Sequence, residues 1–393
     1  MLKNKKILIG ATGSIAIYKT LELIRLLIKA EASVRVIMSE SAKEFITPLT
    51  FEAISQNRVL HVESESWACD LNHIHIGKWA DIFVIAPATA NTINKLAYGV
   101  ADNLLTQSVL AFDKKILIAP SANTNMILNP ITKDSLRKLK KLGFKICEPQ
   151  QEKLLACNDV GVGAMAEPKS IFDLLARELL KDKFWLDKKV VITGGGSIEK
   201  IDDVRYLTNF SSGKQADALA YAYFLAGADV TLITSKSSES LHVKTLHVNS
   251  SSEYSKAIKK SVIDGSYLVM CAAISDFIPK ETKSGKLKKE SLGDKWSLEL
   301  IKNSDILLEI DKKRLKTIGF KAELDADLAL KSAKNMLSKK SLDAVCLNIL
   351  GEKNSFGSDQ NEIVFIGKNF QTKIELSSKL NIATEIVELT KKL

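Results

Sequence analysis

Cysteine is scarce in this chain of 393 residues, and the few cysteines lack the spacing of a metal site. There are five of them, an odd number, and no two stand in a Cys-x-x-Cys pair. This pattern argues against a disulfide framework and against a structural zinc site. It is typical of a protein kept in a reducing compartment, so we expect the cytoplasm.

Long apolar runs are also missing. No stretch approaches the ~20 residues that a membrane-spanning helix needs, and we expect no membrane partner. The opening MLKNKKILIG combines positive charge with a short apolar run, but no small-residue cleavage site follows. We interpret it as leading into a β-strand rather than as a signal peptide.

Basic residues are in excess, but not in the arrangement of a nucleic-acid binder. The net charge is +10, yet no stretch interleaves basic and aromatic residues as a single-strand binder does. The lysines are spread along the chain, and small ligands that carry phosphate explain the charge as well. We therefore expect no nucleic-acid partner.

Short apolar runs separated by helical patterns fill the first half. This alternation predicts an α/β domain with a parallel sheet covered on both faces. The expected strands are residues 6–11, 33–38, 81–87, 114–120 and 144–149, with helices at about 14–30 and 168–180.

The charged segment 180–189, LKDKFWLDKK, lacks apolar periodicity and is predicted to be a linker. The strand-helix pattern then restarts, so we expect two tandem open parallel-sheet domains, residues 1–183 and 186–393. The expected strands of the second half are 190–196, 229–234, 267–273, 317–323 and 343–348, with a helix at 214–226, a hairpin at 362–376 and a last helix.

Polar and small residues follow the expected strands of the first half, where ligands of open parallel sheets bind. GATGSIAIYK (10–19) offers a turn at a helix start that suits a phosphate. It is not GxGxxG, which argues against a dinucleotide and leaves a mononucleotide such as FMN open. The candidate cofactor residues here and in the turns after the other strands are Gly10, Thr12, Gly13, Ser14, Ser39, Ala86, Pro87, Thr89 and Asn91.

Two histidines, His73 and His75, stand at a spacing of two just before an expected strand. On a strand both would face one side, as a metal pair does, but no third ligand has suitable spacing. Asn123 lies in PSANTNM, which places it at the exposed end of another strand. Cys157 lies in a loop of small and acidic residues.

The second half contains a similar turn. NFSSGK (209–214) offers an amide, two hydroxyls, a glycine and a lysine at an expected helix start. Such a cluster binds an anion through N–H groups and the helix dipole. An ordinary helix cap explains the same residues, and the segment is not a Walker A motif.

Taken together, GATGSIAIYK, HIHIGKWAD, APATAN and PSANTNM resemble the flavin-dependent cysteine decarboxylases. Within them the match is to bifunctional coenzyme A biosynthesis flavoproteins, in which phosphopantothenoylcysteine decarboxylase is fused to phosphopantothenate–cysteine ligase. The resemblance implies a flavodoxin-like FMN-binding domain followed by a Rossmann-like nucleotide-binding domain. It implies that His73 assists oxidation and decarboxylation, that Asn123 holds the substrate carboxylate, and that Cys157 donates a proton in the reductive half.

CAAISDF, GKLKK, KNSDIL, IGFKAE and FGSDQNE resemble the ligase half of the same family. That half uses CTP and Mg²⁺ to join cysteine to 4′-phosphopantothenate through an acyl-cytidylate. By resemblance, Asn209 contacts this intermediate and Lys286 belongs to a flap that closes on it. The resemblance implies that the nucleotide is bound by Ala272, Ala273, Asp276, Lys286, Asn303, Ser304, Asp305, Ile306, Phe320 and Lys340.

Several positions depart from the family pattern. They are Ala122, Asn158, Ala164, Ser197 and Ile198, Gln215 and Ala216, and Met336, for which Lys334 is a candidate substitute. The resemblance implies a homo-oligomer, a dodecamer built from trimers of the first half and dimers of the second. Two alternatives are a flavin-binding regulatory subunit of the same fold and an NAD(P)-dependent oxidoreductase. The three residues His73, Asn123 and Cys157 argue against the former, and the absence of GxGxxG argues against the latter.

Overall fold

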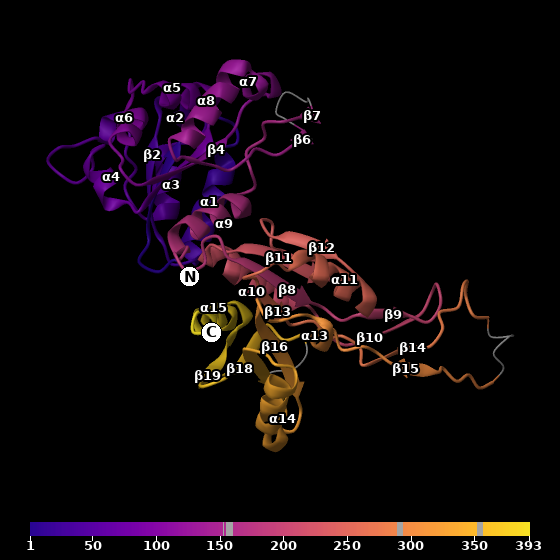
Figure 1. The fold of residues 1–393 in the computed structure, drawn as a ribbon. Helices are drawn as coiled ribbons and strands as arrows, with labels where there is room; N and C mark the ends of the chain where they lie inside the picture. Colours follow the sequence, from indigo (N-terminus) through magenta and orange to yellow (C-terminus); the bar gives the residue numbers. More distant parts are fainter. Residues whose placement is uncertain (152, 155–159, 289–293, 352–356) are drawn as a thin grey trace. The chain divides into compact units, whose positions relative to one another are not determined.

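The chain, in a computed structural model, divides into two compact units, Met1–Leu180 and Lys181–Leu393, which are described separately (Figure 1). The structure describes residues 1–151, 153–154, 160–288, 294–351 and 357–393. No helix within these ranges is both long and apolar enough to span a bilayer.

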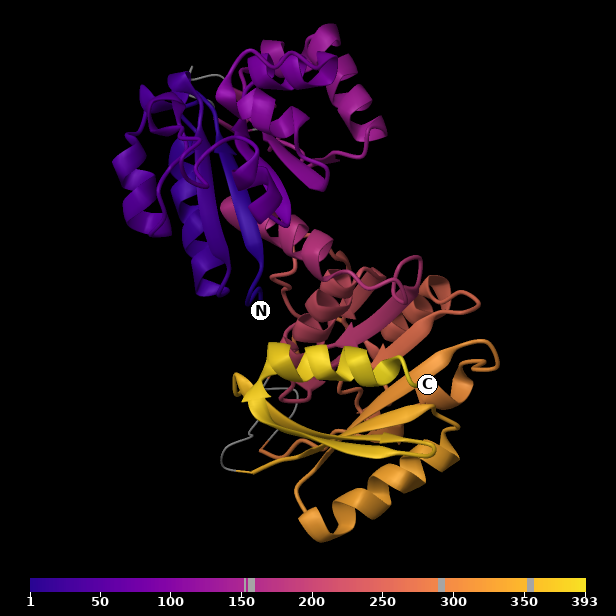
Figure 2. The same ribbon diagram turned by 90° about the vertical axis from the view of Figure 1, so that its left-hand side faces the viewer.

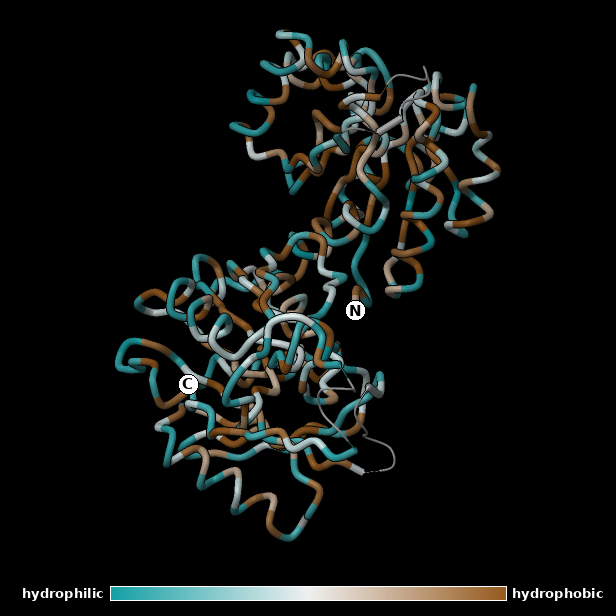
Figure 3. Tube along the Cα trace, turned by 90° about the vertical axis from the view of Figure 1, so that its right-hand side faces the viewer, coloured by the Kyte–Doolittle hydropathy of each residue, from teal (hydrophilic) through white to brown (hydrophobic). Residues whose placement is uncertain are grey.

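The first unit is built on a five-stranded parallel sheet with the order β2-β1-β3-β4-β5. This is the strand order of flavodoxin-like folds, and it confirms the α/β fold predicted from the sequence. The strands are β1 (Lys6–Ala11), β2 (Ser33–Met38), β3 (Ile82–Ala88), β4 (Lys115–Pro120) and β5 (Lys145–Ile146). Figure 3 shows these strands as largely hydrophobic segments inside the unit.

Helices cover this sheet because each presents an apolar stripe to it. Alternate strand residues such as Leu8, Phe83 and Ile118 share one apolar cluster with α4, α5, α6 and α8. A second group of helices consists of α1 together with α3 and α9, which pack against it. The helices are α1 (Ile17–Lys29), α2 (Glu40–Lys43), α3 (Pro48–Ser55), α4 (His75–Trp79), α5 (Ala90–Tyr98), α6 (Leu104–Leu110), α7 (Thr124–Leu128), α8 (Pro130–Lys141) and α9 (Pro168–Leu180), with a 3₁₀ turn at Val62–Ser64.

The second unit contains an eight-stranded sheet with the order β12-β11-β8-β13-β16-β17-β18-β19. Its first six strands are parallel, and the predicted hairpin near the chain end adds two antiparallel strands at one edge. The strands are β8 (Lys189–Gly194), β11 (Asp229–Thr234), β12 (Lys244–His247), β13 (Tyr267–Met270), β16 (Lys316–Glu323), β17 (Ala344–Ile349), β18 (Gln360–Gly367) and β19 (Gln371–Ser378). Strand β12 was not anticipated.

Two helices of the second unit lie together on one face of its sheet. These are α10 (Lys214–Ala226) and α15 (Lys379–Thr390), which pack against each other (Figure 2), and the hydroxyls of Tyr223 and Thr390 are 3.0 Å apart. The helices α11 (Ser251–Ser261), α13 (Ile306–Glu309) and α14 (Ala326–Lys339) share the apolar cluster that contains Val191, Leu268 and Val345.

An arm of two short antiparallel ladders extends from this sheet (Figure 1). One ladder joins β9 (Ile198–Lys200) to β10 (Tyr206–Thr208), and the other joins β14 (Phe277–Pro279) to β15 (Leu300–Lys302). We use the name arm for residues 198–208 together with 277–288 and 294–302. Its strands are too short to show a sequence period, so the sequence did not predict them.

The two units divide after Leu180, inside the predicted linker 180–189, but residues 181–189 belong to the second unit. Trp185 is fully buried, and its ring lies 4.9 Å from those of Tyr223 and Tyr267 in edge-to-face contacts. Lys391 forms an ion pair with Asp182. The charged residues around Trp185 leave the segment without apolar periodicity, so the sequence did not reveal this buried residue.

Candidate functional site

The turns after β1 and β3 are tied together through one buried threonine. The Thr12 hydroxyl donates to the carbonyl of Pro87 at 2.7 Å and accepts from the amide of Thr89 at 3.1 Å. Thr89 in turn caps α5, its hydroxyl accepting from the amide of Thr92. Ser14 extends the group toward β4, since its hydroxyl is 3.0 Å from that of Ser121. The carboxyl ends of three strands therefore meet in one polar cluster, as predicted.

The start of α1 is left open beside this cluster. No side chain caps the helix, and no acidic residue stands in its first turn. Uncapped N–H groups at a helix start attract an anion. The helix begins at Ile17 rather than near Ser14, so Ser14 belongs to the turn, where its hydroxyl also accepts from the amide of Ala16 at 3.3 Å.

The two glycines of this segment matter because they carry no side chain, and not because they adopt a backbone conformation reserved for glycine. Neither Gly10 nor Gly13 has a positive φ. A Cβ on Gly13 would lie 2.6 Å from the Ser41 side chain, and one on Gly10 would lie 3.0 Å from the Phe83 ring. Gly13 therefore lets the first turn approach the segment after β2, whereas Gly10 lies within β1 and serves packing.

Other residues assigned to the cofactor lie around the same edge. The amide of Ser39 donates to the carbonyl of Ala11, which holds the end of β2 beside the end of β1. Ala86 is buried, with its carbonyl accepting from Thr20. Asn91 is exposed on the first turn of α5.

Asn123 begins α7, and its side-chain oxygen accepts from the amide of Asn125. The adjacent Ala122 donates its amide to the carbonyl of Gly163. A Cβ on Gly163 would lie 2.1 Å from the Ala122 carbonyl oxygen, so only glycine permits this approach. The chain just after the Cys157 segment is thereby fixed to the Asn123 turn.

Cys157 itself lies outside the described residues, as does Asn158. The flanking strands β6 (Lys153–Leu154) and β7 (Val160–Gly161) pair antiparallel. Gln150 and Ala164 form a further bridge. The role assigned to Cys157 therefore stays a prediction, made for a segment whose two ends lie close together.

The histidines do not lie on a strand. His75 opens α4, and His73 precedes it. The Nδ1 of His73 is 2.7 Å from Glu65 Oε1, and its ring stands edge-on to Trp67. The Nδ1 of His75 is instead within hydrogen-bond distance of Asn72. The two rings take different partners, and this separates their roles.

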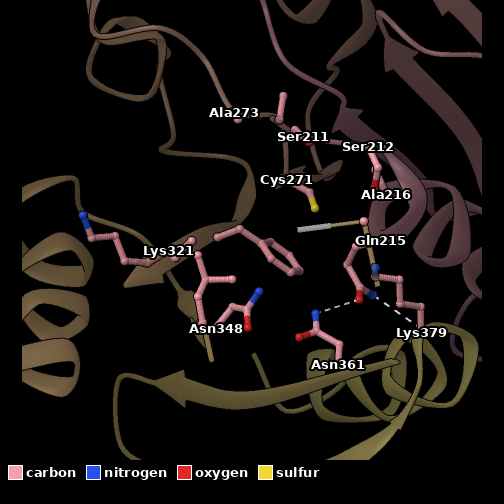
Figure 4. A pocket seen from close by; sticks show the side chains of 16 residues that line it. Ser211, Ser212, Gln215, Ala216, Cys271, Ala273, Lys321, Asn348, Asn361 and Lys379 are labelled. Carbon is pink, nitrogen blue, oxygen red and sulfur yellow. Dashed lines mark hydrogen bonds between the residues drawn. The ribbon is translucent and has the colours of Figure 1, made fainter. Parts of the chain in front are cut away.

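The second unit contains a cavity of about 210 Å³ at the carboxyl ends of its central strands (Figure 4). Three residues assigned to the nucleotide, Ala272, Ala273 and Phe320, are in its lining. The 209–214 turn contributes Ser211, Ser212 and Gly213. No side chain caps α10, which starts there. The structure thus brings the 209–214 turn and part of the expected nucleotide site to one cavity.

Asn209 stands next to this cavity, since its amide nitrogen donates to the Ala273 carbonyl at 3.0 Å. Ser197, where the family has another residue, is fully buried and binds Ser275 through its hydroxyl. This contact holds the loop after β13. The departure at Ser197 therefore supports the loop, and the sequence alone did not indicate this.

Four of the remaining residues that were assigned to the nucleotide form two contacting pairs outside the cavity lining. The amide of Asn303 donates to the Asp276 carbonyl at 2.8 Å. Lys340 forms an ion pair of 2.6 Å with Asp305, which also caps the helix that begins at Ile306. The backbone amide of Ser304 is held by the Asn303 side chain. The contact between Asn303 and Asp276 joins this group to the loop after β13.

Lys286 lies on the arm rather than in the cavity lining. Its neighbours are fixed to the turn between β9 and β10: the amide of Gly285 donates to Asp203, and that of Leu287 donates to Asp202. Arg205 binds Asp202 through its guanidinium and keeps the pKa of that carboxyl well below its usual range. Hydrogen bonds therefore hold the backbone on both sides of Lys286, whose side chain is exposed.

Met336 packs inside the unit, and a Cβ on Gly319 would lie 2.7 Å from its terminal methyl. Lys334 is exposed. Three further cavity residues, Gln215, Asn361 and Lys379, were not identified from the sequence as ligand-binding. They come from α10, β18 and α15, and only folding brings them together. The departure of Gln215 from the family pattern was the available signal.

A flavodoxin-like domain with an open polar turn, followed by an α/β domain with an anion-compatible cavity, defines a two-domain flavoprotein-like class. Comparison with known proteins agrees. The family model described as DNA/pantothenate metabolism flavoprotein C-terminal domain matches residues 185–393. The model described as Flavoprotein matches residues 1–180.

The similarity to curated relatives runs over the full chain. The chain is 38% identical to the coenzyme A biosynthesis bifunctional protein CoaBC of Haemophilus influenzae, covering 98% of this chain and 97% of that protein. It is 37% identical to that of Bacillus subtilis, covering 99% and 97%. A solved C-terminal domain of a CoaBC protein is 27% identical, with a TM-score of 0.44, covering 54% of this chain and 97% of that one. The chain belongs to the family of coenzyme A biosynthesis bifunctional proteins.

Proposed function

We propose that this chain catalyses two consecutive steps of coenzyme A biosynthesis. Residues 186–393 ligate cysteine to 4′-phosphopantothenate, and residues 1–183 decarboxylate the 4′-phosphopantothenoylcysteine formed. The observation that carries the proposal is the full-length similarity to bifunctional relatives, with both halves matched by their own family models.

FMN is the cofactor of the first half. The residues fit it, because the uncapped start of α1 and the Ser14 hydroxyl suit its phosphate, and Gly13 keeps the turn free of side-chain bulk. When bound, the flavin supplies a two-electron acceptor and donor. His73 moves a proton during decarboxylation, Asn123 holds the substrate carboxylate, and Cys157 returns a proton. A thiol suits that last step because its pKa lies nearer neutrality than that of a hydroxyl.

CTP is the co-substrate of the second half, with its phosphates at the Ser211–Gly213 turn and the start of α10. Asn209, tied to Ala273, holds the acyl-cytidylate. Among the described residues no three His, Cys, Asp or Glu side chains form a metal site. Mg²⁺ would therefore bind mainly through the substrate phosphates, as this ion commonly does.

Self-association completes the proposal. Apolar side chains are exposed along the arm and beside it, and a monomer gains nothing from exposing them. They are Val204, Tyr206, Phe210, Phe277, Trp296, Leu300 and Ile301. We infer that a second copy covers them, in line with the homo-oligomer expected from the resemblance. The dodecamer and the cytoplasmic location stay predictions.

One assay tests the proposed function. Purified protein should be yellow with FMN, and it should convert 4′-phosphopantothenate, cysteine, CTP and Mg²⁺ to 4′-phosphopantetheine, with products followed by mass. A parallel reaction with ATP tests the choice of nucleotide. A yellow protein that forms neither 4′-phosphopantothenoylcysteine nor 4′-phosphopantetheine would instead support the alternative of a flavin-binding regulatory subunit.

Replacing Lys286 tests the flap. We expect Lys286→Gln to lower CTP-dependent pyrophosphate release by on the order of 10²-fold, because one ammonium no longer neutralises charge as phosphorus is attacked. Decarboxylation of supplied phosphopantothenoylcysteine should not change. The matched control is Lys283→Gln, which removes an exposed lysine that is paired with Glu281. Equal loss of both activities would mean that the change acts through folding or assembly.

A further inference from the structure

The described lining of the cavity in the second unit is positively charged. Among the sixteen described residues that line it, two are lysines and none is aspartate or glutamate. Lys321 is compensated, because its ammonium lies 3.2 Å from Glu323. Figure 4 shows its side chain extending away from the cavity. The free charge of the cavity is therefore that of Lys379.

Lys379 forms no ion pair with an acidic side chain within the described part of the chain. Its ammonium donates to the backbone carbonyl of Ser358. Asp359 is nearby, but its carboxylate is paired with Lys214 at 2.6 Å. Burial, and then the charge of Lys214, lower the pKa of Lys379, and the charge of Asp359 opposes them only in part. A half-buried cation whose nearest described carboxylate is shared with another lysine is incompletely compensated, which favours an anionic ligand.

The place of Lys379 in its helix adds to this effect. It is the first residue of α15, a twelve-residue helix, where the helix dipole disfavours a cation and favours an anion. The start of α10 faces the same cavity through Gly213 and Gln215. Local preference would not select lysine at this position, which is the kind of conflict that marks functional sites.

Two amides fix the floor of the cavity next to Lys379 (Figure 4). The Asn361 amide nitrogen donates to Gln215 Oε1 at 3.0 Å, and the Gln215 amide nitrogen reaches the Lys379 carbonyl at 3.5 Å. Asn361 is 3% exposed. This chain of contacts joins α10, β18 and α15, so it sets the position of Lys379 relative to the Ser211–Gly213 turn.

We propose that Lys379 is a phosphate-binding residue of the ligase cavity, placed by the Gln215–Asn361 amide pair opposite the Ser211–Gly213 turn. The inference rests on the proposed function for the identity of its ligand. Two phosphate sources reach this site, the triphosphate of CTP and the phosphate monoester of 4′-phosphopantothenate. They share the chemistry that Lys379 recognises, and the experiment distinguishes them.

Titration calorimetry on the full chain tests the proposal, with inorganic tripolyphosphate, CTP and 4′-phosphopantothenate as separate probes. Lys379→Met should weaken binding of a phosphate ligand by on the order of 10-fold to 100-fold, the range for losing one charged hydrogen bond. A loss for tripolyphosphate and CTP assigns Lys379 to the triphosphate, and a loss for 4′-phosphopantothenate alone assigns it to the monoester. Lys379→Arg should recover most of the affinity.

The melting temperature without ligand distinguishes a ligand-binding role of Lys379 from a structural role. Since the ammonium of Lys379 is half-buried and forms no ion pair with a described acidic side chain, Lys379→Met should melt at or above the temperature of the parent protein when no ligand is present. The matched control is Lys373→Met on β19, which removes a lysine paired with Glu362 and Glu375 outside the cavity. It should leave all three affinities unchanged.

The outcomes are distinct. Unchanged affinities in Lys379→Met, or an equal loss in Lys373→Met, would overturn this inference while leaving the proposed ligase intact. A lower melting temperature without ligand would make Lys379 a structural residue and would also overturn it. If the parent protein binds none of the probes, the proposed ligase function falls together with this inference.

Discussion

Replacing His73 by asparagine is expected to abolish most carbon dioxide release while leaving the protein yellow. Loss of a general acid or base costs about 10²- to 10⁴-fold in rate. His73 suits that role because Glu65 occupies its Nδ1 at 2.7 Å, which fixes the ring and leaves Nε2 for the substrate. The measurement is ¹⁴C-carbon dioxide release from labelled phosphopantothenoylcysteine, with bound FMN read from the visible spectrum.

Two variants sharpen this test. His75→Asn removes the neighbouring imidazole, whose Nδ1 is bound to Asn72 at the start of α4, and it should change the rate little. Glu65→Gln keeps an acceptor beside His73 Nδ1 but not the charge, so it should lower the rate less than the loss of His73 does. A colourless His73→Asn protein would show that the residue holds cofactor, contrary to its proposed role in proton transfer.

The second large effect concerns stability. Trp185→Ala should lower the free energy of unfolding of the second unit by about 3–5 kcal/mol, the usual cost of truncating a buried tryptophan. The reason is that Trp185 is fully buried against Tyr223 and Tyr267. For the same reason a fragment of residues 181–393 should be markedly more stable than one of 186–393. Urea denaturation followed by circular dichroism measures both differences.

The neighbouring aromatic residue is the matched control. Phe184 is 36% exposed, so Phe184→Ala should cost clearly less than Trp185→Ala. If the two fragments unfolded at the same urea concentration, the segment 181–185 would contribute nothing to the stability of the second unit, contrary to this prediction.

The sequence predicted the parts of the fold that depend on local pattern. Buried parallel strands are continuous apolar runs, so β1, β2 and β11 were placed correctly to the residue. The rule that ligands bind at carboxyl ends of strands then selected Thr12 and Pro87, which the structure brings into contact.

What the sequence could not predict depends on contacts between distant segments. The three-residue strands of the arm have no detectable period, yet they place Lys286. Trp185 was masked by its charged neighbours. No spacing rule links Lys379 to the Ser211–Gly213 turn, because the two come from different ends of the second unit and are brought together by contacts of Gln215 with Lys379 and Asn361.

The way the second cavity is assembled has a consequence for biosynthesis. Its walls come from segments that begin at Ser211 and end at Lys379, whereas the five-stranded sheet of the first unit is complete at Ile146. Domains fold as units, the N-terminal one first, while the chain is still being made. In the emerging protein the first unit can therefore fold long before the second cavity is complete, and a chain halted near residue 370 would lack the part of that cavity contributed by Lys379.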